Sequence, residues 1–379
     1  MKKTVIIGSG MAGYSVAREI RRLDVEHVIT FVTDEGGGYY YKPAISNALR
    51  MRKTAATLVL KEVSRLSTEL SAEFVLGEAE NVDIANKTVV LKDATDLEYD
   101  NLVLATGSRP RKIALAAPEN HVFDVNSLAQ YGRLREHLQE GMRIAVIGSG
   151  MIGCEIAEDL IQHGVKPLVI TPDAYPLQRM LPIEIGTCLQ RILYEAGVEW
   201  YCGMKSMEVS ADSTGYAISV DELAPVKADA FLVAAGQVPR AELAKAAGIR
   251  TSVGIVVDEC GLTSEPNIYA LGDCAEYKSG WLPYIAPISF ASKAVALSIT
   301  GEATKMAFPP MPVKLKTHLY PISLLPPASL EDVTAELEAT EGGQKLIYKD
   351  KYGSICGFVL AGDVAREADA IAKTITVAI

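Results

Sequence analysis

The chain has 379 residues, of which 49% are hydrophobic and 22% charged, and its formal net charge is −10 at pH 7. These values describe a globular protein of two or three domains, and the acidic balance argues against nucleic acid as the main partner. The most apolar long stretch, residues 281–299, is interrupted by Lys293 and by prolines near its start, so we expect a buried loop and helix there and no membrane span.

The first elements along the chain form a strand, a turn and a helix. The apolar run at the N-terminus is too short for a signal peptide, so a cytoplasmic location is expected. The pattern predicts a strand ending at Gly8, a helix from Met11 to Leu23 and a second strand from His27 to Val32. The same order returns 140 residues later, with a helix from Met151 to His163 and a strand from Lys166 to Ile170. An internal repeat of this size predicts two Rossmann-type units.

The first unit carries a complete glycine fingerprint, Gly8, Gly10 and Gly13, between its strand and its helix. In such a fingerprint the first glycine permits the tight turn, the second lets the backbone approach a pyrophosphate, and the third lets helix and strand pack closely. The helix N-terminus then offers N–H groups and the positive end of a dipole to the phosphates. Asp34, with Glu35 as its close rival, follows the second strand and is expected to bind ribose hydroxyls.

The second unit repeats the fingerprint as Gly148, Gly150 and Gly153. The position after its second strand is held by Thr171, followed by Pro172 and Asp173. No Arg or Lys occupies this position to bind a 2′-phosphate, since Arg179 lies eight residues further on. The pattern therefore favours NADH over NADPH.

Two further strands end in similar ways. Residues 99–110 contain an apolar run that ends at Thr106-Gly107, and residues 230–240 contain one that ends at Ala235-Gly236. In both, the glycine allows the backbone to approach a ligand or another chain segment closely. A third motif, residues 263–275, ends an apolar strand with Gly272-Asp273.

The six cysteines show no close pairing. They are Cys154, Cys188, Cys202, Cys260, Cys274 and Cys356. Redox disulfides and metal sites usually show Cys-x-x-Cys or similarly close spacing. We therefore expect reduced, mostly buried thiols and no metal site.

The last 70 residues differ from the rest. Residues 306–327 are rich in proline, and residues 345–348 and 355–360 predict a β-hairpin around Lys351-Tyr352-Gly353. A helix is predicted from Ala365 to Thr376. Together these features indicate a small additional domain.

Residues 263–275, after two fingerprints, resemble the flavoprotein reductases that contain two dinucleotide-binding domains. Residues 40–46 are similar to a segment of the rubredoxin and ferredoxin reductases, and residues 311–317 resemble more closely the rubredoxin reductases, including those that serve a nitric oxide reductase. The resemblance implies that Asp273 binds the flavin ribityl chain and that Lys42 and Lys316 lie near the flavin, where a cation steadies negative charge on the reduced ring. Asn47 departs from the ferredoxin-type members, many of which have a lysine at this position.

The resemblance also implies cofactor contacts and a domain plan. We expect an α/β fold of two interleaved Rossmann-like dinucleotide-binding domains plus a small C-terminal α+β domain. The FAD-binding domain would comprise residues 1–111 and 240–309, the NAD(P)H-binding domain residues 112–239, and the C-terminal domain residues 310–379. The expected FAD contacts are Gly8, Gly10, Met11, Ala12, Gly13, Asp34, Glu35, Lys42, Pro43, Val82, Ala105, Thr106, Gly107, Arg109, Gly272, Asp273 and Lys316. The expected NAD contacts are Gly148, Gly150, Met151, Ile152, Gly153, Glu155, Thr171, Ala235 and Gly236.

The absence of an early cysteine shapes the expected function. Disulfide reductases of this kind carry a redox cysteine pair early in the chain, and related oxidases carry a single cysteine there, but the first cysteine here is Cys154. The resemblance therefore implies that electrons pass from NAD(P)H through FAD directly to a small iron protein, most simply rubredoxin or a rubredoxin-like domain, without a catalytic acid or base. A ferredoxin reductase of an oxygenase system and a non-catalytic redox-sensing flavoprotein remain as alternatives, and monomer and dimer are both open. The expected docking cations are Arg50, Arg52, Lys53, Arg109, Arg111 and Lys112.

Overall fold

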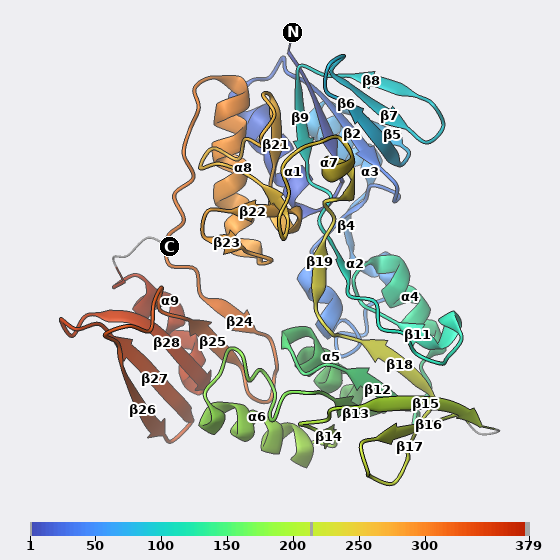
Figure 1. The fold of residues 1–379 in the computed structure, drawn as a ribbon, viewed down its shortest axis with the longest axis vertical. Coiled ribbons are helices and arrows are strands. Elements are labelled where there is room, and N and C mark those ends of the chain that lie inside the picture. The colour runs from blue at the N-terminus through green and yellow to red at the C-terminus, as the bar shows by residue number, and fades with distance from the viewer. Residues whose placement is uncertain (1, 213–214, 376–379) are drawn as a thin grey trace. The chain divides into compact units, whose positions relative to one another are not determined.

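A computed structural model describes residues 2–212 and 215–375, which form two compact units (Figure 1). Unit 1 comprises Met1–Lys42, Val59–Arg109 and Gln237–Phe308. Unit 2 comprises Pro43–Leu58, Pro110–Gly236 and Pro309–Ile379. Each unit therefore collects segments that lie far apart in the sequence.

Unit 1 is built on a five-stranded parallel sheet in the order β21-β9-β1-β2-β5. Its strands are β21 (Ile268–Ala270), β9 (Asn101–Leu104), β1 (Lys3–Ile7), β2 (Val28–Thr33) and β5 (Ala72–Leu76). The β1 and β9 residues are almost fully buried, as expected for a parallel sheet with helices on both faces. The helices are α1 (Met11–Leu23), α3 (Val63–Leu70), α7 (Glu242–Ala246) and α8 (Ile285–Thr300), and α1 packs against α8.

Smaller elements complete unit 1. Three antiparallel strands, β6 (Ala79–Asp83), β7 (Thr88–Leu91) and β8 (Asp96–Glu98), form one sheet. Another contains β20 (Ile255–Val256), β22 (Ala275–Tyr277) and β23 (Gly280–Trp281), and β3 (Tyr39–Tyr40) pairs with β4 (Val59–Lys61). The short 3-10 helix of unit 1 is η3 (Gly272–Cys274), whereas η1 (Lys42–Asn47) has only Lys42 in unit 1 and its other residues in unit 2. Strand β10 (Ser108–Pro110) pairs with β19 (Gln237–Pro239) where the chain leaves unit 1 and returns to it.

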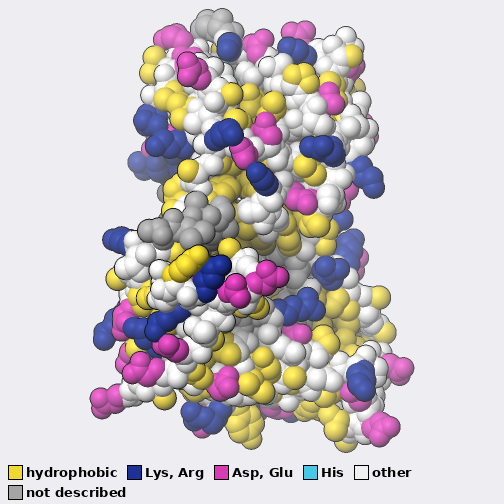
Figure 2. Space-filling model, turned by 60° about the vertical axis from the view of Figure 1, so that its left-hand side comes forward, with side chains coloured by type: hydrophobic (Ala, Val, Ile, Leu, Met, Phe, Trp, Pro, Cys, Tyr) yellow, Lys and Arg dark blue, Asp and Glu magenta, His cyan; other side chains and the backbone are white. Residues whose placement is uncertain are grey.

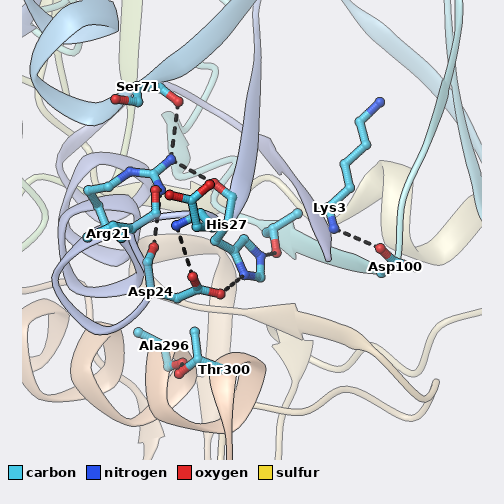
Figure 3. A network of polar contacts seen from close by, with 11 residues as sticks. Lys3, Arg21, Asp24, His27, Ser71, Asp100, Ala296 and Thr300 are labelled. Atoms are coloured by element: carbon cyan, nitrogen blue, oxygen red, sulfur yellow. Dashed lines mark hydrogen bonds and ion pairs between the residues drawn. The ribbon is translucent and has the colours of Figure 1, made fainter. Parts of the chain in front are cut away.

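The C-terminal end of α1 is held by a single arginine (Figure 3). The Arg21 guanidinium donates to the carbonyl oxygens of Leu70 at 2.7 Å, Asp24 at 3.1 Å, Val25 at 2.5 Å, His27 at 2.7 Å and Ser71 at 3.1 Å. A cation at a helix C-terminus satisfies carbonyls that the helix leaves unpaired. This network fixes the turn that leads from α1 into β2.

Unit 2 contains a second parallel sheet with the same plan. Its order is β11-β18-β12-β13-β14, so β12 and β13 correspond to β1 and β2. The strands are β11 (Val122–Phe123), β18 (Ala230–Val233), β12 (Arg143–Ile147), β13 (Lys166–Ile170) and β14 (Glu199–Tyr201). The helices are α2 (Ala55–Leu58), α4 (Leu128–His137), α5 (Met151–Gln162) and α6 (Ile183–Glu195), with η2 at Glu119–His121. A three-stranded antiparallel sheet, β15 (Met207–Asp212), β16 (Gly215–Val220) and β17 (Val226–Ala228), packs its apolar side against β12, β13 and β18.

The C-terminal part of unit 2 is a five-stranded antiparallel sheet with a short helical end. The order is β24-β25-β28-β27-β26, with β24 (Val313–Leu315), β25 (Ile322–Leu325), β28 (Ile355–Gly362), β27 (Gly343–Lys349) and β26 (Thr334–Thr340). The chain then forms η4 (Asp363–Glu367) and α9 (Ala368–Ala372). Figure 1 shows these elements in colours from orange at β24 to red at the C-terminus, with the helical end beside the sheet.

The structure confirms the expected fold class and most predicted elements. The first helix and β13 match their predicted bounds, whereas α5 ends one residue earlier than predicted and β2 is shifted by one residue. The hairpin of β27 and β28 is confirmed and is longer than predicted. The predicted helix Ala365–Thr376 is wrong in length, because η4 takes its first residues and α9 ends at Ala372; Thr376 lies outside the described residues.

Candidate functional site

The fingerprint of unit 1 has the geometry of a pyrophosphate-binding turn. Gly8 adopts φ +110°, and a Cβ there would lie 2.3 Å from the carbonyl oxygen of Ala105. A Cβ at Gly13 would lie 2.1 Å from the carbonyl oxygen of Gly8. At Gly10, by contrast, a Cβ would meet no protein atom within 4 Å. Packing alone thus explains two glycines, and the third fits a backbone that a phosphate group approaches at the N-terminus of α1.

Two carboxylates follow β2 at the same edge of the sheet. The Ser9 and Thr33 hydroxyls are hydrogen-bonded at 2.7 Å, and Thr33 also accepts the N–H of Glu35 at 3.2 Å. This arrangement fixes the backbone after β2 while the side chains of Asp34 and Glu35 stay exposed. Asp34 also lies 4.0 Å from the guanidinium of Arg240. Both acids are therefore exposed at the position where a ribose is expected.

The third motif lies against the start of α1. Gly272 adopts φ +78°, and a Cβ there would lie 2.7 Å from the Cβ of Ala12. The Ser108 hydroxyl donates to Asp273 at 3.0 Å. Burial raises the pKa of Asp273, while the charge of Lys42 and the Ser108 hydrogen bond oppose that rise. The structure thus brings Asp273, Lys42 and the first fingerprint into one region of unit 1.

The other residues expected to contact FAD lie nearby or support that region. Ala105 follows β9 and is the backbone against which Gly8 packs, while the Thr106 hydroxyl donates to the carbonyl oxygen of Arg240 at 2.6 Å. Gly107 adopts φ +70°, and its carbonyl oxygen accepts the N–H of Arg240 at 2.9 Å. Arg109 is ion-paired with Glu242. Met11 and Ala12 begin α1, and Val82 is buried in β6.

The fingerprint turn of unit 2 has nearly the same backbone geometry as the fingerprint turn of unit 1. Gly148 also adopts φ +110°, and a Cβ there would lie 2.6 Å from the carbonyl oxygen of Ala234. A Cβ at Gly153 would lie 2.1 Å from the carbonyl oxygen of Gly148, whereas one at Gly150 would meet nothing within 4 Å. Gly236 adopts φ +99° and is equally open. The second fingerprint therefore also leaves room for a phosphate group to approach the backbone at its middle glycine. Met151 and Ile152 begin α5, and Ala235 follows β18.

Thr171 is placed differently from a ribose-binding residue. Its side chain is 1% exposed, and its hydroxyl is hydrogen-bonded to that of Ser149 at 2.9 Å. It also accepts the N–H of Asp173 at 3.2 Å. Ser149, Thr171 and Asp173 thus reproduce the arrangement of Ser9, Thr33 and Glu35 in unit 1. Asp173, which the sequence pattern did not single out, is the carboxylate at the equivalent position.

A buried ion pair joins α5 to the C-terminal region. Glu155 is 3% exposed, and its carboxylate lies 3.0 Å from Lys316 Nζ and accepts the Lys316 N–H at 2.8 Å. The Ser46 hydroxyl donates to the same carboxylate, and Lys316 Nζ also donates to Ser46 Oγ at 3.0 Å and to the carbonyl oxygen of Pro43. Glu155 was expected to contact NAD and Lys316 to lie near the flavin. The structure shows that the two residues are bound to each other.

Two more carboxylates of α5 bind backbone N–H groups. Glu158 accepts the N–H groups of His318 and Leu319, each at 2.6 Å. Asp159 accepts those of Leu49 and Arg50, each at 2.8 Å. Burial raises the pKa of Asp159 to about 7, although its two N–H bonds and the charge of Arg50 oppose the rise. One face of α5 therefore holds both the segment after Pro43 and the segment around Lys316.

The sequence reasoning missed Glu158 and Asp159. The available signal was the presence of three acidic residues within five positions of an otherwise apolar helix. Acidic residues in a helix usually form a solvated face, so this signal pointed to the surface. Because buried carboxylates need hydrogen-bond donors, an apolar helix with acids on one face is better read as one that binds another segment.

The cysteines are all free, as expected, but only Cys154 and Cys274 are buried. Burial raises the pKa of both thiols, so neither is activated as a nucleophile. In residues 2–212 and 215–375, no helix is both long enough and apolar enough to cross a membrane.

Comparison with protein families identifies this arrangement. Residues 2–296 match the model of the pyridine nucleotide-disulphide oxidoreductases. The chain belongs to this family. Residues 305–375 match the model of a rubredoxin binding C-terminal domain, which covers the antiparallel sheet of unit 2. Use of FAD and of NAD(P)H is a property that family membership implies. The resemblance to rubredoxin reductases expected from residues 40–46 and 311–317 is confirmed.

Curated relatives align along nearly the whole chain. Rubredoxin-NAD(+) reductase of Acinetobacter baylyi is 37% identical over 375 residues, covering 96% of this chain and 95% of the relative. Rubredoxin-NAD(+) reductase of Alcanivorax borkumensis is 33% identical and covers 97% of both chains. Nitric oxide reductase FlRd-NAD(+) reductase of Aeromonas hydrophila is 31% identical and covers 96% of this chain and 93% of the relative.

Solved structures share the fold. The covalent putidaredoxin reductase–putidaredoxin complex matches with a TM-score of 0.87 at 23% identity, covering 100% of this chain and 94% of that one. The NADH:rubredoxin oxidoreductase of Clostridium acetobutylicum matches with a TM-score of 0.80 at 21% identity, covering 99% and 94%. At this level of identity the likeness confirms the fold class.

Proposed function

We propose that this protein is an NAD(P)H-dependent flavoprotein reductase that passes electrons to rubredoxin or to a rubredoxin-like domain. The observation that carries the proposal is the pair of open fingerprints, at Gly10 and Gly150, in a chain that also has a rubredoxin-binding C-terminal region. Curated relatives bear the names of rubredoxin reductases and align from end to end. We expect the reaction to take place in the cytoplasm.

The cofactors supply the redox chemistry. FAD, when bound, accepts a hydride from a nicotinamide and releases electrons one at a time. The protein binds and orients both groups. The N-termini of α1 and α5 offer N–H groups to the two pyrophosphates. Asp273 offers a hydrogen-bond acceptor to the ribityl hydroxyls, and Lys316 offers a positive charge whose position Glu155 fixes.

We infer a preference for NADH from Asp173. The buried hydroxyl of Thr171 is engaged within the protein, so the carboxylate of Asp173 is the group available to accept hydrogen bonds from ribose hydroxyls. A carboxylate at this position repels the 2′-phosphate of NADPH. We expect Asp173→Ala to lower the ratio of kcat/KM for NADH to that for NADPH about tenfold or more. An unchanged ratio would contradict the assignment.

Stopped-flow spectroscopy tests the whole proposal. The purified protein is mixed without oxygen first with NADH and then with oxidised rubredoxin. We expect the flavin absorbance near about 450 nm to bleach and then rubredoxin to be reduced rapidly. Transfer only to a two-iron ferredoxin would identify a ferredoxin reductase instead. A protein that binds no flavin, or whose flavin does not respond to NADH or NADPH, would refute the reductase function.

A further inference from the structure

The turn Arg50–Lys53 and the residues His318 and Leu319 are held side by side by neighbouring carboxylates of α5. Asp159 binds the N–H groups of Leu49 and Arg50, and Glu158 binds those of His318 and Leu319. Asp159 and Glu158 are adjacent in α5 and almost completely buried. The stretches that precede the two segments are in direct contact, since Lys316 Nζ lies 3.0 Å from Ser46 Oγ. A rigid helix therefore makes one surface from segments that are more than 260 residues apart in the sequence.

Hydrogen bonds hold the backbone of the turn Arg50–Lys53 in place. The Met51 N–H donates to Asn47 and the Lys53 N–H to Ala48, and the Tyr131 hydroxyl donates to the carbonyl oxygen of Lys53 at 2.6 Å. Arg52 adopts φ +54° at the tip of the turn. The side chains of residues 50–53 are exposed. The turn thus presents its side chains from a fixed backbone.

This surface is positively charged in an acidic protein. Residues 46–54 and 312–320 together contain five Lys and Arg residues and no Asp or Glu, and two of the five, Lys314 and Lys316, are ion-paired with Asp369 and Glu155. Within the described part of the chain, Arg50, Arg52 and Lys53 make no ion pair with a carboxylate at salt-bridge distance. Figure 2 shows that positive and negative side chains are mixed over the face drawn there. A chain segment that carries cations and no acidic residue therefore differs from that face.

The same two segments also carry exposed apolar side chains. Met51 is 45% exposed and Leu319 is 41% exposed. Electron-transfer partners form small, short-lived interfaces, typically with a limited apolar centre and a charged rim that steers the encounter. The combination of Met51 and Leu319 with Arg52 and Lys53, which pair with no carboxylate within the described residues, fits a small acidic protein.

The opposite edge of the C-terminal sheet has the opposite charge. Residues 331–341, which include β26, contain Glu331, Asp332, Glu336, Glu338 and Glu341 and no Lys or Arg. Strand β26 lies four strands away from β24, or about 19 Å at the usual strand spacing. Glu336 pairs with Lys349 and Asp332 with Lys351, while Glu331, Glu338 and Glu341 make no ion pair within the described residues, so this edge keeps a negative charge that disfavours an acidic partner. Of the two edges of the rubredoxin-binding domain, the charge pattern favours the one beside α5.

We propose that the acidic iron protein that accepts the electrons docks on this surface, defined by Arg50, Met51, Arg52, Lys53, His318 and Leu319. This inference rests on the proposed function and extends it, because it places part of the docking site outside the C-terminal domain. Arg50 also interacts electrostatically with Asp159, so changes at this residue would disturb the turn itself. Arg52 and Lys53 are therefore the residues to test.

The test compares Arg52→Glu/Lys53→Glu with the charge-matched control Lys166→Glu/Lys293→Glu. Lys166 and Lys293 are exposed residues at the start of β13 and on α8. At low ionic strength we expect the second-order rate constant for rubredoxin reduction to fall about tenfold to a hundredfold in the first variant and less than about threefold in the control. The defect should shrink at about 0.5 M salt, because exposed charges are then screened. Reduction of the bound flavin by NADH, and turnover with the neutral acceptor menadione, should stay at the wild-type rate.

The outcomes separate the docking surface from the proposed function. Wild-type rates of rubredoxin reduction in Arg52→Glu/Lys53→Glu, or an equal loss in the control, would overturn the docking surface while leaving the reductase function intact. If the wild-type protein reduces a two-iron ferredoxin and not rubredoxin, the comparison is made with that acceptor and the same result is expected. If NADH-reduced protein transfers electrons to neither iron protein, the proposed function and the docking surface both fall. Equal flavin content and equal thermal unfolding temperatures of the variants exclude misfolding as the cause.

Discussion

Replacing Glu155 tests whether the buried ion pair with Lys316 holds the C-terminal region to α5. Two unit charges 3.0 Å apart attract by about 5–6 kcal/mol at an effective dielectric constant of 20. Desolvation of the carboxylate offsets several kcal/mol of this attraction. Lys316 keeps 35% of its side chain exposed, which reduces the net value further. We therefore expect a coupling free energy of about 2 kcal/mol between the two side chains.

A double-mutant cycle measures this coupling. The four proteins are the wild type, Glu155→Gln, Lys316→Met and the double variant, each saturated with FAD and unfolded in urea. Each single substitution should lower the free energy of unfolding by about 2–3 kcal/mol, and the double variant should lose about 2 kcal/mol less than the sum. The pair Arg143–Glu199 in the same unit, at 2.8 Å, is the control, because its cation is as exposed as Lys316 but its carboxylate is 42% exposed, and it should show a coupling of about 0.5 kcal/mol. Equal coupling in the two cycles would refute the argument from burial.

Three further predictions follow from the cofactor turns and from α5. Gly148→Ala should lower the unfolding temperature strongly, because its backbone has φ +110° and its Cβ would lie 2.6 Å from a carbonyl oxygen. Gly150→Ala should keep the unfolding temperature, because its Cβ meets no protein atom within 4 Å, and should raise KM for NADH. Asp273→Ala should yield protein depleted of FAD, and a full flavin complement by absorbance would count against its assigned role. Burial raises the pKa of Asp159 to about 7 in the folded state, whereas an unfolded Asp has a pKa near about 4. Between these two values the folded state holds a proton that the unfolded state has released. The free energy of unfolding should therefore fall as the pH rises from about 4 to about 7. In Asp159→Asn, urea unfolding across that range should show a smaller fall, and an equal fall would refute the link to Asp159.

The two dinucleotide turns could be predicted because their chemistry is local. A tight turn at Gly8 or Gly148 needs a positive φ, and the close helix–strand contact needs a glycine three residues after the open position. These demands leave a pattern within a few residues of sequence. The same holds for the hairpin of β27 and β28, where the turn residues and the strand alternation lie side by side.

The contacts of α5 could not be predicted because their partners are distant in sequence. Glu155, Glu158 and Asp159 bind groups that lie more than 100 residues before or after them. Five of those partners are backbone N–H groups, which every residue except proline possesses and which leave no mark on the sequence. The terminal helix was overestimated for a related reason. Ile375 belongs to the apolar cluster with Phe358 and Leu360, so burial against the sheet explains an apolar spacing that resembled a long helix.

Helix α5 binds the backbone of its two neighbouring segments, and this leaves side chains in those segments free to change with the electron acceptor. Glu158 and Asp159 hold their two segments through main-chain N–H groups, so the side chains at His318 and Leu319 are not needed for the attachment. Substitutions at these positions can therefore accumulate without loosening the fold. A lineage that adopts a different electron acceptor can substitute the contact residues one at a time, while α5 keeps the backbone of both segments in place.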